Sequence, residues 1–583
     1  MNDAIEPLDP NVLNRIKRLH ETRQQILTLP VEAVMDHIVQ APQPAALVHS
    51  FKEEDFYFLL QDVGPEDAQP LLSLASNKQW EYILDLEIWE KDRLSSSALT
   101  RWLDLLYKAD PLRMIKWCLD HKTDLLQYYL FKNIEVRIRE TDQMSSDFDD
   151  DFFTQDDTFY VRILDPPADS EEGQTAVEQR HEFLADLIGR LSQYDHVVFQ
   201  NLLVESAAIL PAETEEEAYR LRNVRLAEKG FLPFDEAVGV YQPLKVTEVE
   251  AGPPKSLASP LDDAVPAPGP LYPVRLLPEN NRFTDALQLI DTEEALHQIQ
   301  SEFAGLCNQV ITADHQKITS KDELGQIVRK VCGFLNLGLA RLAQEKEPGA
   351  VGNWADLIKR VPLSRFFRLG YGQVLELKWR AEKWHQNSWF SAQGLPLSFW
   401  DEEWLGVLGG LLLKKPLFFE NYQNGQLYRD FAAYEDIQAT GQILSQIMAI
   451  DRLLRLMDLN PGPLTAHRFI TYKNLLLTLW ARHYLDLSPQ PAALSLQELK
   501  NLFEALFIPA DDPASQTRFR INPPMRPLFL AWMADRTGLR DYEISEKVGT
   551  SLEALFLEVE GEYGRIAPKD LDPRYILHFL LEK

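Results

Sequence analysis

Six aspartates in one short segment are the residues of this sequence best suited to bind a metal ion. They lie within residues 147–157, where carboxylates are dense enough to ligate a divalent cation. The segment lacks the central glycine and the final glutamate that space the ligands of an EF-hand loop, so its spacing specifies no metal site. We therefore expect a mobile acidic loop, with a site for an ion or a basic partner as the alternative. The six are Asp147, Asp149, Asp150, Asp151, Asp156 and Asp157.

Basic and aromatic side chains alternate in a second segment, residues 365–404. Such a mixture can stack on nucleic-acid bases or bind an anion. It also fits a helix that buries its aromatic rings while its cations reach solvent, which is the interpretation we favour. Gly370 and Gly372 lack the third glycine of a dinucleotide-binding loop, and we expect them to interrupt a helix. The basic residues kept as candidates for contact with an anion or a partner are Arg365, Arg368, Lys378, Arg380 and Lys383.

Sequence motifs for catalysis and for cofactors are absent. The chain has no Walker loop and no zinc-protease, serine-hydrolase, kinase or deaminase motif. Cys118, Cys307 and Cys332 are far apart, and the histidines show no paired ligand spacing. We therefore expect no cofactor, no enzyme activity and no disulfide framework, in a reducing compartment such as the cytoplasm. No segment is apolar enough for a signal peptide or a membrane span, so we expect no membrane insertion.

The net charge of −30 is concentrated in the first half of the chain. Residues 1–245 contain 46 Asp and Glu against 24 Lys and Arg, which gives a net charge of −22. An acidic surface repels phosphate backbones, so we expect no nucleic-acid binding through this half. A basic protein partner is compatible with such a surface, and so is a role in solubility alone.

The elements that must position these residues begin with helical patterns. The phrase Leu-Leu-x-x-x-x-Pro occurs twice, ending at Pro65 and at Pro111, with an offset of 46 residues. An offset of this size is typical of a two-helix solenoid unit. Proline is favoured in the first turn of a helix, so we expect each proline to begin the second helix of a stacked pair.

Residues 65–72 carry the phrase Pro-Glu-Asp-Ala-x-x-Leu-Leu. In this phrase the chain resembles the cytoplasmic N-terminal helical domain of MgtE-type magnesium transporters. The resemblance covers about the first 135 residues and implies helical repeats there. The membrane segments of those transporters are missing from this sequence, so we expect no transport by this chain.

Apolar and polar residues alternate at 134–140 and again at 158–164. This period of two, together with the β-branched and aromatic residues, predicts an antiparallel β-hairpin near 134–164. The acidic segment would then form its loop. Helical patterns return after it, and we expect Gly230 to end one of these helices.

A proline-rich stretch, residues 246–273, predicts a semi-rigid linker. It separates an acidic helical-repeat lobe, residues 1–245, from an all-α lobe, residues 274–583. The predicted fold is therefore mainly α and two-lobed, with the small hairpin in the first lobe. Capping-box spacing predicts helix starts. The pairs are Thr214 with Glu217, Asp291 with Glu294, Ser320 with Glu323, Ser495 with Glu498, and Thr550 with Glu553.

The acidic hairpin, the PEDA phrase, an Ala-Tyr-Arg-Leu-Arg-Asn helix at 218–223 and a Phe-Arg-Leu-Gly-Tyr-Gly segment at 367–372 occur together in this chain. In this combination the chain resembles a family of large bacterial helical proteins of unknown function. The resemblance covers most of the chain and implies the helical fold. It implies no active site.

Extended helical surfaces offer contact area for other macromolecules. With no catalytic motif present, we expect a non-catalytic cytoplasmic scaffold or adaptor that binds a protein partner. One alternative is a regulatory sensor of a divalent ion or a small ligand, with the acidic loop as the ion site. Another is an enzyme whose pocket lies in the C-terminal lobe, near the segment Arg365–Trp404.

Overall fold

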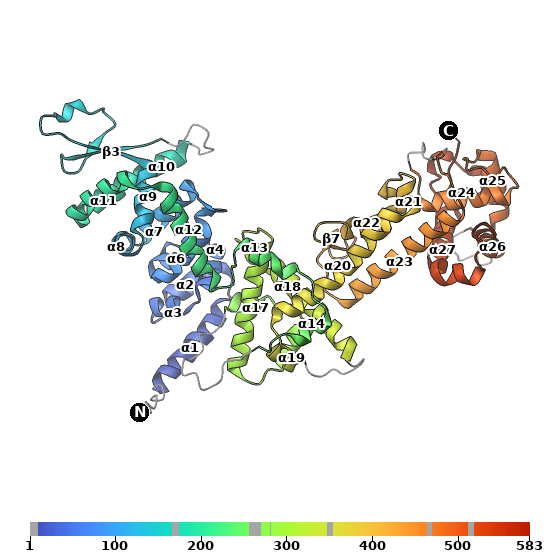
Figure 1. The fold of residues 1–583 in the computed structure, drawn as a ribbon, viewed down its shortest axis with the longest axis horizontal. Coiled ribbons are helices and arrows are strands. Elements are labelled where there is room, and N and C mark those ends of the chain that lie inside the picture. The colour runs from blue at the N-terminus through green and yellow to red at the C-terminus, as the bar shows by residue number, and fades with distance from the viewer. Residues whose placement is uncertain are drawn as a thin grey trace. The chain divides into compact units, whose positions relative to one another are not determined.

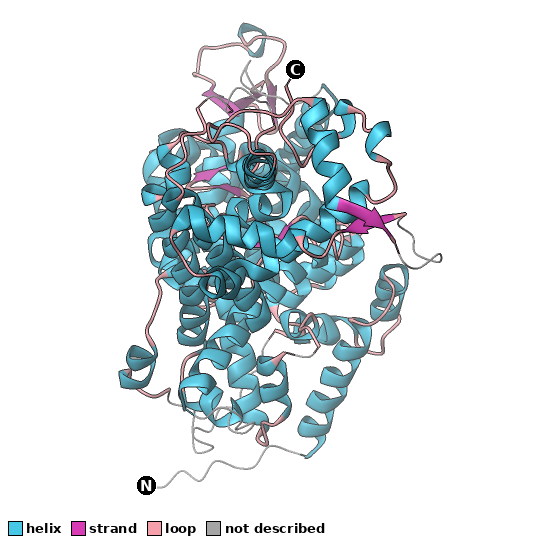
Figure 2. Cartoon of the chain, turned by 90° about the vertical axis from the view of Figure 1, so that its right-hand side faces the viewer, coloured by secondary structure: helices cyan, strands magenta, loops and turns pink. Residues whose placement is uncertain are grey.

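The computed structural model describes residues 10–165, 174–255, 270–279, 281–346, 354–462, 464, 469–510 and 518–582. Helices dominate these residues (Figure 1 and Figure 2), as the sequence predicted. The strands of the described ranges form four small antiparallel sheets. No helix within the described part of the chain is long and apolar enough to cross a bilayer.

The chain folds into two compact units, which are bounded differently from the lobes expected at 1–245 and 274–583. Residues 274–332 belong to the first unit, although the sequence assigned them to the second lobe. Residues 256–269 of the expected linker lie outside the described residues. Unit 1 contains Met1–Gln242, Pro253–Cys332 and Val351–Ser364, and unit 2 contains Pro243–Gly252, Gly333–Ala350 and Arg365–Lys583.

Unit 1 begins with a series of short helices, each of which packs on helices one or two places away in the chain. Helix α4 packs on α6, α5 on α7, and α8 on both α7 and α9. Trp80, Trp102 and Trp117 are buried between them, where their large rings fill the core of the helical series. A two-stranded ladder of β1 (Trp89–Glu90) and β2 (Arg93–Leu94) precedes α7. The helices are α1 (Pro10–Ile26), α2 (Val31–Val39), α3 (Pro44–Ser50), α4 (Glu53–Val63), α5 (Gln69–Leu74), α6 (Asn77–Glu87), α7 (Ser96–Ala109), α8 (Pro111–His121) and α9 (Thr123–Asn133).

The two prolines that were expected to begin helices behave differently. Pro111 is the first residue of α8, and the carboxylate of Asp110 caps that helix. The prediction for Pro65 is wrong, because this residue lies in the turn between α4 and α5. Gly64 ends α4 with a φ of +93°, a conformation that glycine adopts without steric cost, and α5 begins only at Gln69.

The predicted hairpin is confirmed. Strand β3 (Ile134–Ile138) pairs antiparallel with β5 (Phe159–Ile163), with Ile134 opposite Ile163. A third, two-residue strand, β4 (Phe153–Thr154), pairs with the other edge of β5, giving the order β3-β5-β4. Two residues are too few to show alternation in a sequence, so the pattern could not reveal β4.

Helices of mixed length complete unit 1. Gly230, with a φ of +85°, follows the end of α12 as predicted. A Cβ on Gly230 would lie 2.5 Å from the Cα of Gly305 in α17, so these two backbones touch. This contact is one physical reason why α17 belongs to unit 1. The elements are α10 (Gln174–Tyr194), α11 (His196–Ala208), α12 (Pro211–Ala227), α13 (Phe234–Ala237), α15 (Leu271–Arg275), α16 (Arg282–Gln288), α17 (Glu293–Ala313) and α19 (Trp354–Arg360), with 3-10 turns at Ser145–Asp147 and Val238–Tyr241.

Unit 2 consists mainly of long helices. Both α18 (Lys321–Lys346) and α20 (Leu363–Asn387) contain a boundary between the units. The other helices are α14 (Val246–Ala251), α21 (Trp389–Ala392), α22 (Asp401–Leu411), α23 (Tyr434–Leu456), α24 (Tyr472–Tyr484), α25 (Leu496–Leu506), α26 (Met525–Thr537) and α27 (Asp541–Tyr563). The strands are β6 (Phe418–Phe419), β7 (Tyr428–Arg429), β8 (Phe507–Pro509) and β9 (Phe519–Ile521), and 3-10 turns span Leu397–Trp400, Pro568–Asp570 and Pro573–Tyr575.

The expectation that Gly370 and Gly372 interrupt a helix is wrong, since both lie inside α20. A Cβ on Gly370 would lie 2.0 Å from the carbonyl oxygen of Phe334 in α18. A Cβ on Gly338 in α18 would lie 2.0 Å from the carbonyl oxygen of Phe366. These glycines therefore let α18 and α20 cross with their backbones in contact.

Two of the predicted helix caps are confirmed. Ser320 with Glu323 and Ser495 with Glu498 exchange the reciprocal hydrogen bonds of a capping box. The other predicted starts are wrong, because capping-box spacing also arises by chance within or beside a longer helix. Thr214 lies inside α12 and Thr550 inside α27, and α17 begins at Glu293, after Thr292 rather than after Asp291.

Candidate partner-binding surface

The aspartates of the acidic loop do not converge on one point. Asp149, Asp151 and Asp157 pair with Arg137, Arg162 and Arg139, which belong to or directly follow strands of the hairpin. Within the described part of the chain, no group of three or more His, Cys, Asp and Glu side chains could hold a metal ion. Three of the six loop carboxylates are thus paired with arginines of the hairpin.

Asp157 and Asp147 also accept hydrogen bonds from nearby residues of the hairpin and its loop. The Tyr160 hydroxyl donates to the Asp157 carboxylate at 2.8 Å, and this bond, with Arg139, lowers the pKa of Asp157. Asp147 accepts a hydrogen bond from the backbone N–H of Met144 at 2.9 Å. Asp150 is exposed.

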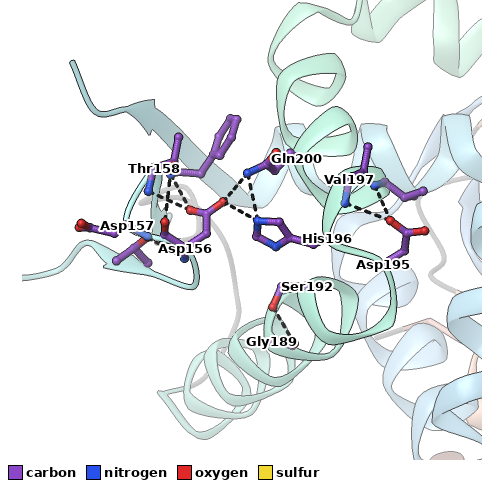
Figure 3. Close-up of polar contacts among 12 residues, drawn as sticks. Asp156, Asp157, Thr158, Gly189, Ser192, Asp195, His196, Val197 and Gln200 are labelled. Carbon is purple, nitrogen blue, oxygen red and sulfur yellow. Dashed lines mark hydrogen bonds and ion pairs between the residues drawn. The ribbon is translucent and has the colours of Figure 1, made fainter. Parts of the chain in front are cut away.

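Asp156 attaches the loop to the first turn of α11 (Figure 3). One carboxylate oxygen accepts the backbone N–H groups of Thr158 and Phe159 at 3.0 and 2.8 Å. The other accepts the Gln200 amide at 2.8 Å and lies 3.5 Å from Nε2 of His196. Burial alone would raise the pKa of Asp156, but these donors outweigh it, and the pKa is lowered. The tip of the hairpin is therefore held against α11.

Helix α11 carries apolar side chains on both of its faces. Phe199, Leu202 and Leu203 are buried, and the helix packs on α9 and α10. On the other side, Val197 is 65% exposed and Val204 is 48% exposed. A helix that is apolar all round is normally covered on every side. No described segment of the chain covers the valines on the outer side of α11.

Helix α12 also leaves apolar side chains exposed. Its inner face is fixed by buried Glu215, which accepts hydrogen bonds from the backbone N–H of Leu94 at 2.8 Å and from the Arg93 guanidinium at 3.0 Å. Its outer side leaves Leu221 and Val224 exposed. We call the following six residues the apolar surface: Val197, Val198, Val204, Leu210, Leu221 and Val224.

Helix α9 lies against both α11 and α12 and holds them in one assembly. Gln127 of α9 donates to Glu205 of α11 at 2.8 Å, and the next residue, Tyr128, donates to Glu215 of α12 at 3.3 Å. Burial, followed by the nearby Glu215, raises the pKa of Tyr128 to about 12, so its hydroxyl stays a donor at neutral pH. The apolar surface is therefore carried on a fixed scaffold within unit 1.

Sequence reasoning missed the apolar surface, although a signal was present. The run Val197-Val-Phe-Gln-Asn-Leu-Leu-Val204 places apolar residues around the whole helix circumference. An amphipathic helix would have its apolar residues on one face only, and this run does not. A count of the apolar residues on each face would have indicated that one buried face cannot contain them all.

The basic residues of α20 do not form a common site. Lys378 donates to the carbonyl oxygens of Leu413 and Lys414, and Arg380 donates to the hydroxyl of Ser445 at 2.7 Å. Lys383 is exposed, and Arg365 and Arg368 are half-buried. The aromatic residues around them are buried as predicted, with the exception of Trp379, which is 49% exposed.

Comparison with known proteins identifies the chain at the level of its family. No curated protein and no solved structure matches it. The family of unknown function DUF6178 matches residues 11–582, which is nearly the whole chain and agrees with the resemblance found in the sequence. The resemblance of the first 135 residues to the MgtE domain stays a prediction. The chain belongs to the DUF6178 family.

Proposed function

We propose that the protein is a non-catalytic cytoplasmic scaffold or adaptor, and that it binds a protein partner through the apolar surface of α11 and α12. The observation that carries the proposal is α11 itself, whose inner side is fully packed while valines on its outer side are exposed. Soluble proteins rarely leave large apolar patches uncovered unless a partner covers them. The surface is built on helices, in keeping with the contact surfaces that helical-repeat proteins use.

The charge of this part of the chain defines the kind of partner. Residues 1–245 have a net charge of −22, so a basic protein approaches this surface faster than a neutral or acidic one. The partner surface that fits best is an apolar patch surrounded by lysine or arginine. An ion sensor at the acidic loop has less support, because most of its carboxylates are engaged by arginines or by α11.

A charge-insertion variant tests the proposal. Val204→Lys combined with Val224→Lys places a cation on each helix of the apolar surface, at positions exposed enough to leave the fold intact. We expect the variant to lose a stoichiometric partner that the unaltered protein captures from its native cells, and to bind the purified partner at least about tenfold more weakly.

A matched control places the same two changes elsewhere on unit 1. Val39 and Leu112 are exposed at 45% and 61%, and they lie on α2 and α8. The control variant Val39→Lys with Leu112→Lys should retain the partner, and both variants should melt at the temperature of the unaltered protein. Failure to capture any stoichiometric partner, or equal loss in both variants, would contradict the proposal.

A further inference from the structure

A pocket of about 220 Å³ lies within unit 2, between the start of α22, the start of α24 and the sides of α23 and α27. It is smaller than the pockets that hold drug-sized ligands, which span about 300–1,000 Å³. Only a compact ligand with few non-hydrogen atoms fits it. Neither the acidic loop nor the apolar surface takes part in this site.

One wall of the pocket is aromatic. Trp404 stacks on Tyr472, with ring centroids 4.7 Å apart and ring planes at 7°. Trp400 packs on the same tyrosine at 5.8 Å. All three rings are at most 7% exposed, so their positions are fixed by packing. The faces of such rings attract cations through their π-electrons.

The polar side of the pocket has an excess of negative charge. The Lys473 ammonium lies 2.6 Å from a carboxylate oxygen of Asp401 and 2.7 Å from one of Glu558. Glu403, a third carboxylate of the lining, has no cationic partner in the described part of the chain. His578 also lies beside Glu558, with its Nε2 3.7 Å from a carboxylate oxygen. The lining itself carries three carboxylates and one ammonium group, so an added anion would be repelled.

The ionisation of these groups indicates binding rather than covalent chemistry. Burial alone would lower the pKa of Lys473, but Asp401 and Glu558 outweigh burial and raise it. The lysine is therefore a charged ammonium at neutral pH and is no nucleophile. Burial, followed by the charges of Asp401 and Glu558, also raises the pKa of Tyr472, so its hydroxyl stays protonated.

The backbone at Asp401 gives independent support. Its φ of 66° and ψ of 169° lie in a region that residues other than glycine hardly ever occupy. Strain of this kind persists where the surrounding structure holds it, and it concentrates at ligand sites. Asp401 holds this conformation while its carboxylate pairs with Lys473.

We propose that this pocket binds a small organic cation carrying an ammonium group. The aromatic wall of Trp404 and Tyr472 contacts the cation, and the unpaired carboxylate of Glu403 balances its charge. The Lys473 bridge between Asp401 and Glu558 holds α22, α24 and α27 in position around it. This pocket is separate from the apolar surface of unit 1, so either proposal can fail without the other.

Titration of the full-length protein tests the site. The probes are tetramethylammonium and 1,4-diaminobutane, followed by calorimetry and by thermal melting at constant ionic strength. 1,4-Butanediol and succinate have comparable length without positive charge and serve as controls. We expect saturable heat and a raised melting temperature with at least one of the two cations, and neither effect with the controls. No saturable binding of either cation below about 10 mM would overturn the proposal.

Two neighbouring glutamates locate the binding. Glu403→Gln removes the unpaired carboxylate and should weaken binding of the cation by about fivefold to tenfold. Glu402→Gln alters the adjacent residue, which is exposed like Glu403 but does not line the pocket, and should leave the affinity unchanged. Equal weakening by the two variants would show that the cations bind through general charge and would overturn the assignment to this pocket.

Discussion

Asp436, in the first turn of α23, ties the β6–β7 ladder to that helix. Its carboxylate accepts two hydrogen bonds from Arg429, at 2.7 and 2.8 Å, and the backbone N–H groups of Ala432 and Ala433. Burial alone would raise the pKa of Asp436, but Arg429 and the backbone donors outweigh it and lower the pKa. The ionised carboxylate therefore stabilises the folded state.

The variant Asp436→Asn should lower the free energy of unfolding by about 2 kcal/mol at neutral pH. The folded-state pKa lies below the unfolded value of about 3.9, so the stabilisation is complete above that value and is lost as pH falls through the folded pKa. The difference between the two proteins should be constant from about pH 5 to 8 and shrink below about pH 4. Chemical denaturation across this range measures it.

A surface pair offers the comparison for this prediction. Asp572 pairs with Arg574 at 2.6 Å, and this arginine lowers the pKa of Asp572 to about 2, but the pair is exposed to solvent. Exposed ion pairs contribute little to stability. Asp572→Asn should therefore change the unfolding transition far less than Asp436→Asn. A larger loss for the surface variant would contradict this account of the buried pair.

At the scale of elements, the crossing of α18 and α20 depends on the absence of side chains at their contact. Gly370 and Gly338 approach the backbone of the opposite helix so closely that a Cβ has no room. Glycine inside a helix lowers helix stability by about 1 kcal/mol relative to alanine. The close approach of the two helices requires glycine at these positions, although glycine lowers the stability of each helix.

Gly370→Ala should therefore destabilise unit 2 by about 3 kcal/mol or more, because one helix must move away from the other. Gly561→Ala in α27 is the control, since a Cβ there would meet no atom within 4 Å. This second change should stabilise the protein by about 0.5 to 1 kcal/mol through helix propensity. Thermal and chemical denaturation compare them, and a tolerated Gly370→Ala would show that the helices do not cross in this way.

For the whole molecule, the net charge of −30 governs how partners approach. Salt screens charges beyond about 10 Å at 0.1 M, whereas contact between apolar side chains depends on salt much less. A basic partner of the apolar surface should therefore associate more slowly as salt rises, with little change in its dissociation rate.

Surface plasmon resonance with the captured partner checks this expectation. Between 0.05 and 0.5 M sodium chloride, the association rate should fall by about tenfold or more. An association rate that does not depend on salt would mean that the charge of residues 1–245 plays no part in recognition. The Val204→Lys and Val224→Lys variant should instead raise the dissociation rate, because it disturbs the contact itself.

Features that depend on residues close together in the chain were predictable from the sequence. The β3–β5 hairpin followed from alternation, the capping box of Ser495 and Glu498 from its spacing, and the end of α12 from Gly230. Family membership also followed from short phrases spread along the chain. Each of these depends on conformations that a few neighbouring residues favour by themselves.

Features that depend on distant residues were decided only by the tertiary structure. Gly370 lies inside α20 at a position where α18 leaves no room for a side chain. The pocket of unit 2 joins Asp401, Lys473 and Glu558 from three separate helices. The exposure of Val204 depends on which faces of α11 its neighbours cover. Sequence patterns reflect local preference, whereas burial, ion pairing and backbone contact are set by segments that meet only after folding.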